Sequence, residues 1–379
     1  MKGQSFNRPV CPPSFEGWQQ LTTSEQIFVP FGHRIICSIL SGKPTSIEDI
    51  RSEDQSPGIK DFEANFLRLI DKMTNGSKIV INSTGTKVTI KPGIITGGKI
   101  KHDCGTSRSI GYFLEGIIGL MPFAKDTFTI EFNGITNDDT DISVDLIRTV
   151  TIPLLKQFGI GAEEEIVFKI LKRGSPPLGG GHVILTCPIV RRELNSVKLI
   201  DEGQIRRVRG IAYTTRVSPQ NGGRMVTAAK SIINKYMQDV FIYSDHFKGP
   251  ESGLSPGFGL TLVAETTTGY SLSAELMAKA GTTPEDLGLA ASKLLLTEIS
   301  NGGCVDTINQ TTAILFMVLS PDAISKIRVG KLSPFTVTFL RHIREFFGVT
   351  FKIEAGDEGK TVILTCRGVG YKNTAKRIH

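Results

Sequence analysis

Residues 183–187 read Val-Ile-Leu-Thr-Cys, and the same string returns at residues 362–366. Each string ends a unit of the same kind. A helix pattern stops at a Phe-Gly pair, a strand containing Phe-Lys-Ile follows, and a turn leads into the repeated strand. Residues 61–90 offer a third, less exact copy. The repeat predicts an α+β protein built of similar lobes, each a small sheet covered on one face by two helices.

The segment between the two best copies has a different pattern. Residues 204–217 resemble an Arg-rich strand, 223–236 a helix and 248–259 a Gly-rich loop. A smaller α/β domain inserted into the repeated core explains this change. We therefore predict an extended or partly disordered leader (1–25), the first part of a core (26–187), an inserted domain (188–288) and the last part of the core (289–379).

Helices are predicted from a 3.6-residue apolar period, and strands from alternation or β-branched runs. Pro153 is expected to kink or interrupt the helix that Asp141 or Ser143 caps. The predicted helices are 61–75, 141–158 or 143–158, 223–236, 283–301 and 334–347. The predicted strands are 78–82, 87–91, 127–132, 166–171, 182–186, 204–217, 258–265, 350–354 and 361–366.

Composition limits the classes of protein to which the chain can belong. Of 379 residues, 40% are apolar and 21% charged, which predicts a globular core and excludes wholesale disorder. The longest apolar stretches, such as 311–320, are too short for a membrane span. The six cysteines lie at least 26 residues apart, without the spacing of a metal knuckle or a CxxC pair. We expect no metal, no cofactor and no membrane partner.

The most specific string is residues 173–183, Arg-Gly-Ser-Pro-Pro-Leu-Gly-Gly-Gly-His-Val. Its prolines stiffen the backbone, and its glycines permit positive φ and close approach. Exposed amides of such a loop can cradle an anion, so Arg173, Gly179, Gly180 and Gly181 are candidate ligands of an RNA phosphate. A purely structural hairpin turn explains the same residues and stays open as the alternative.

This string resembles the signature of the RNA 3′-terminal phosphate cyclase family: Arg-Gly, two residues, Pro, one residue, three glycines, one residue and an aliphatic residue. Residues 40–44, 47–51, 56–59 and 203–212 are also similar to that family, in its order. The resemblance covers the chain after the leader. It implies repeated lobes, each a sheet with two helices, and a smaller inserted domain, in agreement with the repeat.

The sequence departs from the cyclases where those enzymes carry out chemistry. The family's nucleophile is a histidine four residues before a glutamine. Gln310 is present, but Asp306 stands at the histidine position. A neutral histidine nitrogen can attack the α-phosphate of ATP, whereas a carboxylate repels it. Residues 28–33 also lack the glycine run of the family's nucleotide segment. We therefore expect no catalytic residues for cyclisation, and the chain resembles the family's non-cyclase eukaryotic branch.

The resemblance to that branch implies a non-catalytic assembly factor for early pre-rRNA processing and small-subunit biogenesis, located in the nucleolus of the nucleus. It implies a nucleolar ribosome-assembly GTPase, pre-rRNA and components of the small-subunit processome as partners. Two alternatives stay open at this point. One is an endoribonuclease that cuts pre-rRNA with Asp306, Asp103 or His102 as base. The other is an active cyclase, which Asp306 argues against.

Positive charge is concentrated at the end of the chain. Residues 289–379 hold 12 Lys and Arg against 7 Asp and Glu, most of the net charge of +7. Such a basic region suits RNA bound through its phosphates, without sequence preference. A solvated, solubilising surface is the alternative. The remaining candidate RNA- or partner-binding residues are Arg206, Arg207 and Arg209 on the predicted strand, and Arg341 and Arg344 on one helical face, with His342 alongside.

Overall fold

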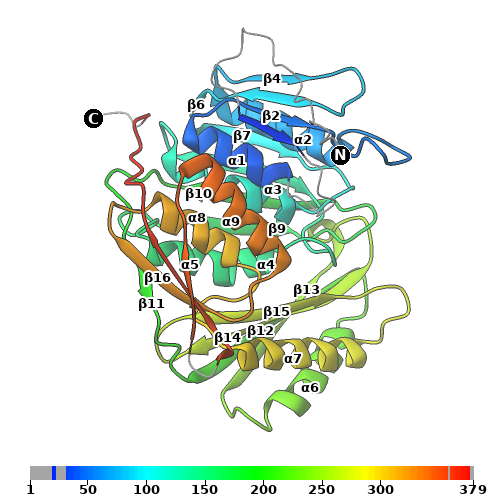
Figure 1. Ribbon diagram of the computed structural model, residues 1–379. Coiled ribbons are helices and arrows are strands. Elements are labelled where there is room, and N and C mark those ends of the chain that lie inside the picture. The colour runs from blue at the N-terminus through cyan, green and yellow to red at the C-terminus, as the bar shows by residue number, and fades with distance from the viewer. Residues whose placement is uncertain (1–18, 23–30, 357–358, 376–379) are drawn as a thin grey trace, which may run out of the picture.

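Three lobes of one topology make up most of the molecule (Figure 1). The computed structural model describes residues 19–22, 31–356 and 359–375. In each lobe two parallel strands lie side by side, and an antiparallel hairpin extends the sheet from the second strand. The strand orders are β1-β2-β5-β4, β7-β8-β10-β9 and β11-β16-β18-β17. The predicted α+β architecture of repeated sheet-and-helix lobes is confirmed.

The lobes follow one another along the chain. Lobe 1 contains β1 (Gln19–Thr22), α1 (Phe31–Ser41), β2 (Thr45–Glu48), α2 (Asp61–Met73), β4 (Lys78–Ile81) and β5 (Val88–Lys91), with a small pair β3 (Thr74–Asn75) and β6 (Ile94–Ile95). Lobe 2 contains β7 (Gly98–Asp103), α3 (Ile110–Ile117), β8 (Phe128–Gly134), α4 (Val144–Leu146), α5 (Ile152–Gln157), β9 (Val167–Lys172) and β10 (Gly181–Cys187). Lobe 3 contains β11 (Lys198–Leu199), α8 (Gln310–Leu319), β16 (Ile324–Val329), α9 (Pro334–Phe347), β17 (Lys352–Ala355) and β18 (Val362–Arg367).

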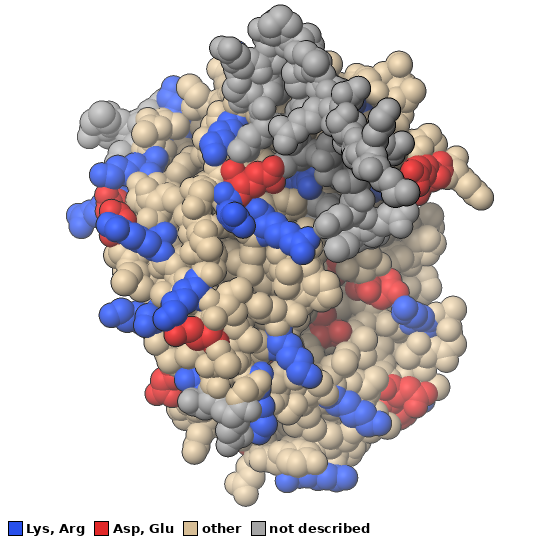
Figure 2. Space-filling model, viewed as in Figure 1, with Lys and Arg blue, Asp and Glu red and all other residues tan. Residues whose placement is uncertain are grey.

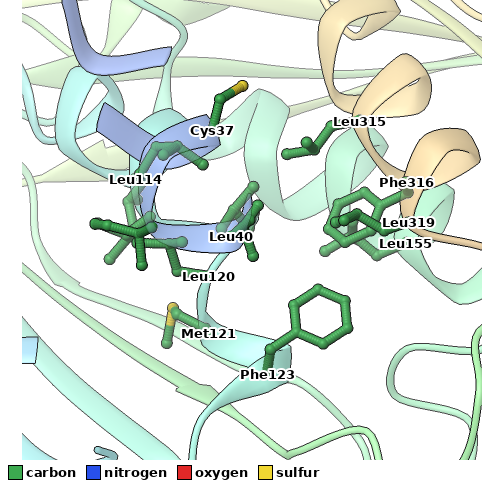
Figure 3. Packing of buried hydrophobic residues seen from close by; sticks show 14 of the residues in the cluster. Cys37, Leu40, Leu114, Leu120, Met121, Phe123, Leu155, Leu315, Phe316 and Leu319 are labelled. Atoms are coloured by element: carbon green, nitrogen blue, oxygen red, sulfur yellow. The ribbon is translucent and has the colours of Figure 1, made fainter. Parts of the chain in front are cut away.

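A large apolar core lies between the lobes and their helices (Figure 3). Side chains from α1, α3 and α5 meet those of α8, among them Leu40, Leu114, Leu155 and Phe316. Every residue of α8 is buried. A helix that is apolar on all sides can be stable only inside a core, and α8 therefore ties lobe 3 to the other two.

The inserted sheet has the order β13-β12-β14-β15. Its elements are β12 (Ile205–Thr215), α6 (Gln220–Ile233), β13 (Val240–Phe247), β14 (Gly257–Thr266), β15 (Ser271–Met277) and α7 (Pro284–Asn301). Helices α6 and α7 share a separate core with this sheet, to which α7 contributes Leu287, Ala291 and Leu295. Gly288 lets the two helices approach, since a Cβ there would lie 2.5 Å from the carbonyl oxygen of Met225. The boundaries 188–288 stay a prediction, and α7 packs with the inserted sheet.

Three local features differ from the sequence-based expectations or refine them. Strand β1 lies inside the predicted leader. The rest of the leader falls outside the described residues. Helices α1, α3 and α8 were not predicted, because none has an acidic first turn or a basic last turn. The helix capped by Ser143 continues past Pro153 through a π-helical turn over residues 147–151.

No helix among the described residues is both long and apolar enough to cross a bilayer.

Candidate functional site

Arg173 follows β9 and is almost completely buried, with 1% of its surface exposed. Nη1 and Nη2 donate to the two carboxylate oxygens of Asp145 at 2.6 and 2.8 Å. Nε and Nη2 donate to Asp245 Oδ2 at 3.0 and 2.7 Å, and Nη1 also donates to Asn137 Oδ1 at 3.3 Å. These contacts use all five N–H groups of the guanidinium. Arg173 therefore has no free N–H group with which to bind an anion, which is the role predicted for it.

The Arg173 contacts connect lobe 2 to the inserted sheet. Asp245 lies on β13, and the guanidinium carbon stands 5.0 Å from the ring centre of Tyr213 on β12. Burial alone would raise the pKa of Asp145, but Arg173 more than offsets this and holds that pKa below its ordinary value. The arrangement is a buried ion pair that holds two parts of the fold together.

The three-glycine loop serves the same junction. Gly179 has φ of +64° and Gly180 of +83°, backbone conformations that favour glycine. The amide of Gly179 donates to the Ser175 carbonyl, and its carbonyl accepts from the Leu254 amide, each at 2.9 Å. Gly181 begins β10, where it is paired with β8. The loop packs its backbone against the inserted segment, which supports the structural alternative over the anion cradle for Gly179 and Gly181.

Asp306 lies between α7 and α8 and is 1% exposed. Its Oδ1 accepts hydrogen bonds from the backbone N–H and the Nδ2 of Asn309 at 2.9 and 2.8 Å. Its Oδ2 accepts from the Ser273 hydroxyl of β15. Burial raises the pKa of Asp306 to about 6, although these hydrogen bonds act in the other direction. A carboxylate bonded in this way is positioned to hold the loop between α7 and α8.

A carboxylate of β15 has a similar environment to that of Asp306. Glu275 Oε1 accepts from the backbone N–H of Ser143, the residue that caps the helix of lobe 2, at 2.9 Å. Its Oε2 is buried and has no hydrogen-bond partner among the described residues. Burial raises the pKa of Glu275 to about 7, and the nearby carboxylates of Asp145 and Asp306 add to the shift. Both carboxylates thus lie where the inserted sheet meets the core.

A small pocket opens beside Asp306, between α5 and the turn that joins β14 to β15. Pro153, Gln157, Tyr270 and Cys304 contribute to its wall. Burial raises the pKa of the Cys304 thiol to about 12, so this group stays protonated at neutral pH and is a poor nucleophile.

Gln310, the second residue of the family motif, is also fully buried. Its Nε2 donates to the Lys331 carbonyl at 3.0 Å, and its Oε1 accepts from the Thr336 hydroxyl at 2.8 Å. Gln310 therefore fastens the first turn of α8 to the first turn of α9. Whether Asp306 is equivalent to the cyclases' histidine stays a prediction.

The arginines of β12 differ from one another. Arg207 forms an ion pair with Glu265 at 2.7 Å, and Arg209 with Asp239 at 2.8 Å. Arg206 is exposed, beside an irregularity in the pairing of β12 with β14, and forms no ion pair with a described residue. Of the three, Arg206 is the one whose charge is not already matched.

Arg341 and Arg344 are both exposed on α9. Figure 2 shows Lys and Arg spread over this side of the molecule, with Asp and Glu between them. His342, predicted to lie alongside, is instead buried, and neither ring nitrogen has a partner among the described residues. Burial, with Arg34, His33 and Arg341 nearby, lowers the pKa of His342 to about 3. The helix turns position 342 inward, so only the two arginines can meet a ligand.

Within the described residues, no group of three or more His, Cys, Asp or Glu side chains is arranged to hold a metal ion. His102 is buried between the rings of Phe113 and Phe132, and Asp103 Oδ1 accepts from the Gly105 amide. Neither residue lines the pocket beside Asp306.

The sequence has relatives that match it over most of its length. A family model described as RNA 3′-terminal phosphate cyclase matches residues 29–353. The chain belongs to this family. It is 57% identical over 362 residues to the probable RNA 3′-terminal phosphate cyclase-like protein of Dictyostelium discoideum, with 91% of this chain and 97% of that protein covered.

Two further relatives extend the comparison. The human RNA 3′-terminal phosphate cyclase-like protein is 50% identical over 356 residues, covering 91% of this chain and 95% of the human one. The rRNA processing protein rcl1 of Schizosaccharomyces pombe is 43% identical over 349 residues, again covering 91% and 95%. The predicted resemblance to the family and to its cyclase-like branch is confirmed.

The sequence analysis did not identify the residues that contact Arg173 and Asp306, nor Glu275 beside them. Asp145 and Asp245 hold Arg173, and Ser273 and Glu275 reach the core from β15. A usable signal was present for β15, because Ser271, Ser273 and Glu275 alternate with apolar residues and so share one face of a strand. Asp145 and Asp245 have no comparable local signature.

Proposed function

We propose that this chain acts in rRNA processing for the small ribosomal subunit, in the nucleolus, as a cyclase-like protein that forms no covalent nucleotide intermediate. The proposal is supported above all by its 43% identity, over 91% of its length, to a protein named for rRNA processing. We further propose pre-rRNA, components of the small-subunit processome and a nucleolar ribosome-assembly GTPase as its partners.

The environment of Asp306 supports the absence of nucleotidyl transfer. The carboxylate is held by Asn309 and Ser273, is 1% exposed and borders a small pocket. A nucleophile must reach the α-phosphate, whereas the Asp306 carboxylate is almost completely buried and its Oδ1 already accepts two hydrogen bonds. The test is incubation with radiolabelled ATP and Mg²⁺ or Mn²⁺, followed by denaturing electrophoresis. We expect an unlabelled protein, and a stable protein–AMP adduct would overturn this part of the proposal.

The role in rRNA processing is testable by complementation. The chain, expressed in fission yeast depleted of its own rRNA processing protein rcl1, should restore normal levels of small-subunit rRNA precursors. The variant Asp306→Asn keeps the size of the side chain and can still bond Ser273 and Asn309. It should complement as well as the wild type, because the carboxylate has no catalytic duty. Failure of the wild type, with stable expression, would contradict the proposal.

No observation favours the endonuclease alternative over this reading. A general base must reach the 2′-hydroxyl of bound RNA. His102 is enclosed by aromatic rings, Asp103 caps a turn, and Asp306 is enclosed. Cleavage of a precursor RNA by the purified chain, abolished in Asp306→Asn, would reverse this conclusion.

The GTPase partner can be tested on α9. The exposed pair Arg341 and Arg344 is our candidate contact, for a protein or for RNA. The double variant Arg341→Ala/Arg344→Ala should weaken co-purification of the GTPase, or reduce the salt dependence of RNA binding if both side chains touch phosphate. Two unchanged measurements would remove this pair from the interface.

A further inference from the structure

The sheet of lobe 3 has one buried and one open face. On the inner face Ile327, Val329 and Leu364 are completely buried in the main core. On the outer face Lys198 and Lys352 are exposed, while Lys326 is partly exposed. Strands β11 and β16 of this sheet lie at the left of Figure 1. This alternation is the period of two that a half-buried sheet requires, and it turns the basic residues of lobe 3 outward.

The outer lysines form a line across the strands. Lys198 of β11 is in register with Lys326 of β16, Lys326 with Thr365 of β18, and Thr365 with Lys352 of β17. Neighbouring strands are about 4.8 Å apart, so the line crosses the sheet in roughly 15 Å. We call Lys198, Lys326 and Lys352 the lysine row.

The charges of this row are incompletely matched. Lys352 pairs with Glu354 at 2.8 Å. Neither Lys198 nor Lys326 forms an ion pair with a described residue, although the two are direct cross-strand neighbours. Like charges this close on neighbouring strands repel each other. A bound anion would relieve the repulsion between the two lysines.

Lobe 2 shows that the topology does not demand such a row. Its sheet carries the line Lys101, Glu131, Ile184 and Lys169 across β7, β8, β10 and β9. There Glu131 occupies the second strand and pairs with Lys101 at 2.8 Å. The repeated Val-Ile-Leu-Thr-Cys string aligns Thr365 with Thr186, so the lobe 2 line that matches the lysine row is Lys99, Thr129, Thr186 and Val167. Lobe 2 therefore has one lysine in the line that corresponds to the lysine row, whereas lobe 3 has three, of which Lys198 and Lys326 are neighbours.

We propose that the lysine row of lobe 3 binds the phosphodiester backbone of RNA. The inference rests on the proposed function only in taking RNA as the anion that the chain meets. Lysine is a point charge on a flexible stem, which suits phosphates but does not read bases. The row runs across the strands, so a ligand that follows it cannot add to the sheet edge as a peptide strand would. Binding must therefore come from charge, which an RNA backbone supplies at every nucleotide.

The test compares salt dependence between variants with equal charge changes. Affinity for a fluorescein-labelled oligouridine and for an unrelated mixed-sequence RNA is measured over a range of salt concentrations. Lys198→Ala/Lys326→Ala should reduce the log–log slope by about 1.4, since each phosphate contact on a single strand contributes about 0.7. At about 0.1 M salt this corresponds to a loss of about 25-fold in affinity. The control Lys169→Ala/Lys172→Ala, on β9 of lobe 2, should leave slope and affinity close to the wild-type values.

A second variant separates binding from folding. Lys326→Glu reproduces in lobe 3 the Lys–Glu neighbour pair of lobe 2. It should therefore leave thermal stability unchanged or raise it, while RNA affinity falls more than in the charge-matched control Lys169→Glu. Equal affinities for these two variants would overturn the lysine row as an RNA surface and leave the role in rRNA processing untouched.

Two further outcomes are decisive. If wild-type protein binds neither RNA, both the inference and the RNA-binding part of the proposed function fail, whereas complementation still tests the processing role. If polyglutamate is bound in a manner that depends on Lys198 and Lys326 while RNA binding does not, the partner is an acidic protein and the inference is wrong.

Discussion

The two edge strands of the inserted sheet, β13 and β15, meet the core in opposite ways. On β13, Asp245 shares with Asp145 a buried arginine whose donors are all used. On β15, the Ser273 hydroxyl donates to the Asp306 carboxylate, and the Glu275 carboxylate accepts from the Ser143 N–H. No Lys or Arg of the described residues forms an ion pair with Glu275 or Asp306. The first contact is electrostatically balanced, whereas the second leaves two acids in a poorly solvated place.

The difference determines how each contact responds to pH. Arginine keeps its charge throughout the neutral range, and Arg173 holds the pKa of Asp145 below its ordinary value, so this ion pair is insensitive to pH there. Burial instead raises the pKa of Glu275 from 4.5 to about 7 and of Asp306 from 3.8 to about 6. The folded protein therefore retains protons that the unfolded chain has released, and its stability falls as pH rises from about 4 to about 7.

The largest effect is expected on the β13 side. Arg173→Met keeps much of the apolar stem but leaves Asp145 and Asp245 without their cation. Removing one partner of a buried ion pair costs about 3–5 kcal/mol, and here two carboxylates lose theirs. Chemical denaturation followed by circular dichroism should show this loss at pH 7. A cost below about 1 kcal/mol would mean that the buried pair contributes little to the junction.

A gain in stability is expected on the β15 side. Glu275→Gln can still accept the Ser143 N–H but no longer ionises. At pH 8 the variant should be more stable than wild type by on the order of 3 kcal/mol, because each raised pKa unit corresponds to 1.36 kcal/mol. At pH 4, where the wild-type side chain is protonated, the two should be equal. Stability curves that stay parallel from pH 4 to pH 8 would contradict a buried, titrating Glu275.

A smaller effect is expected for the hydroxyl that bonds Asp306. Ser273→Ala removes one hydrogen bond to the carboxylate, worth about 2 kcal/mol when the acceptor is charged and about 1 kcal/mol when it is neutral. The destabilisation should therefore be greater at pH 8 than at pH 5. Denaturation midpoints at these two pH values measure the difference, and an equal cost at both would show that Asp306 does not change its charge between them.

The smallest effect is expected from an exposed ion pair of the same sheet. Arg209 pairs with Asp239 through two hydrogen bonds of 2.8 and 3.1 Å, much as Arg173 pairs with Asp145. Asp239 is more than half exposed, with 57% of its side-chain surface accessible. Arg209→Ala should therefore cost less than about 1 kcal/mol. A cost comparable to that of Arg173→Met would show that pairing, and not burial, gives the β13 contact its strength.

Much of the architecture was predictable because its signals are local. Thr283 caps α7 and Ser333 caps α9, each accepting from an amide three residues ahead, and Gly348 ends α9 in the left-handed conformation. Period-two strands and the repeated Val-Ile-Leu-Thr-Cys string likewise need only neighbouring residues. The family signature at 173–183 was readable for the same reason. Its glycines are required by a close backbone approach whether or not a ligand binds.

Only the tertiary structure decided what the charged and polar residues of the site do. Asn309, which holds Asp306, is itself bonded by Thr151, 158 residues earlier in the chain, and Arg173 meets Asp245 across 72 residues. The register that places Lys198 beside Lys326 joins strands that are separated in the chain by the whole inserted sheet and its two helices. Sequence patterns report which face of an element is apolar. Which charged group a buried side chain contacts depends on strands that are distant in the sequence. That contact determines whether an arginine is available to a ligand or holds the fold together.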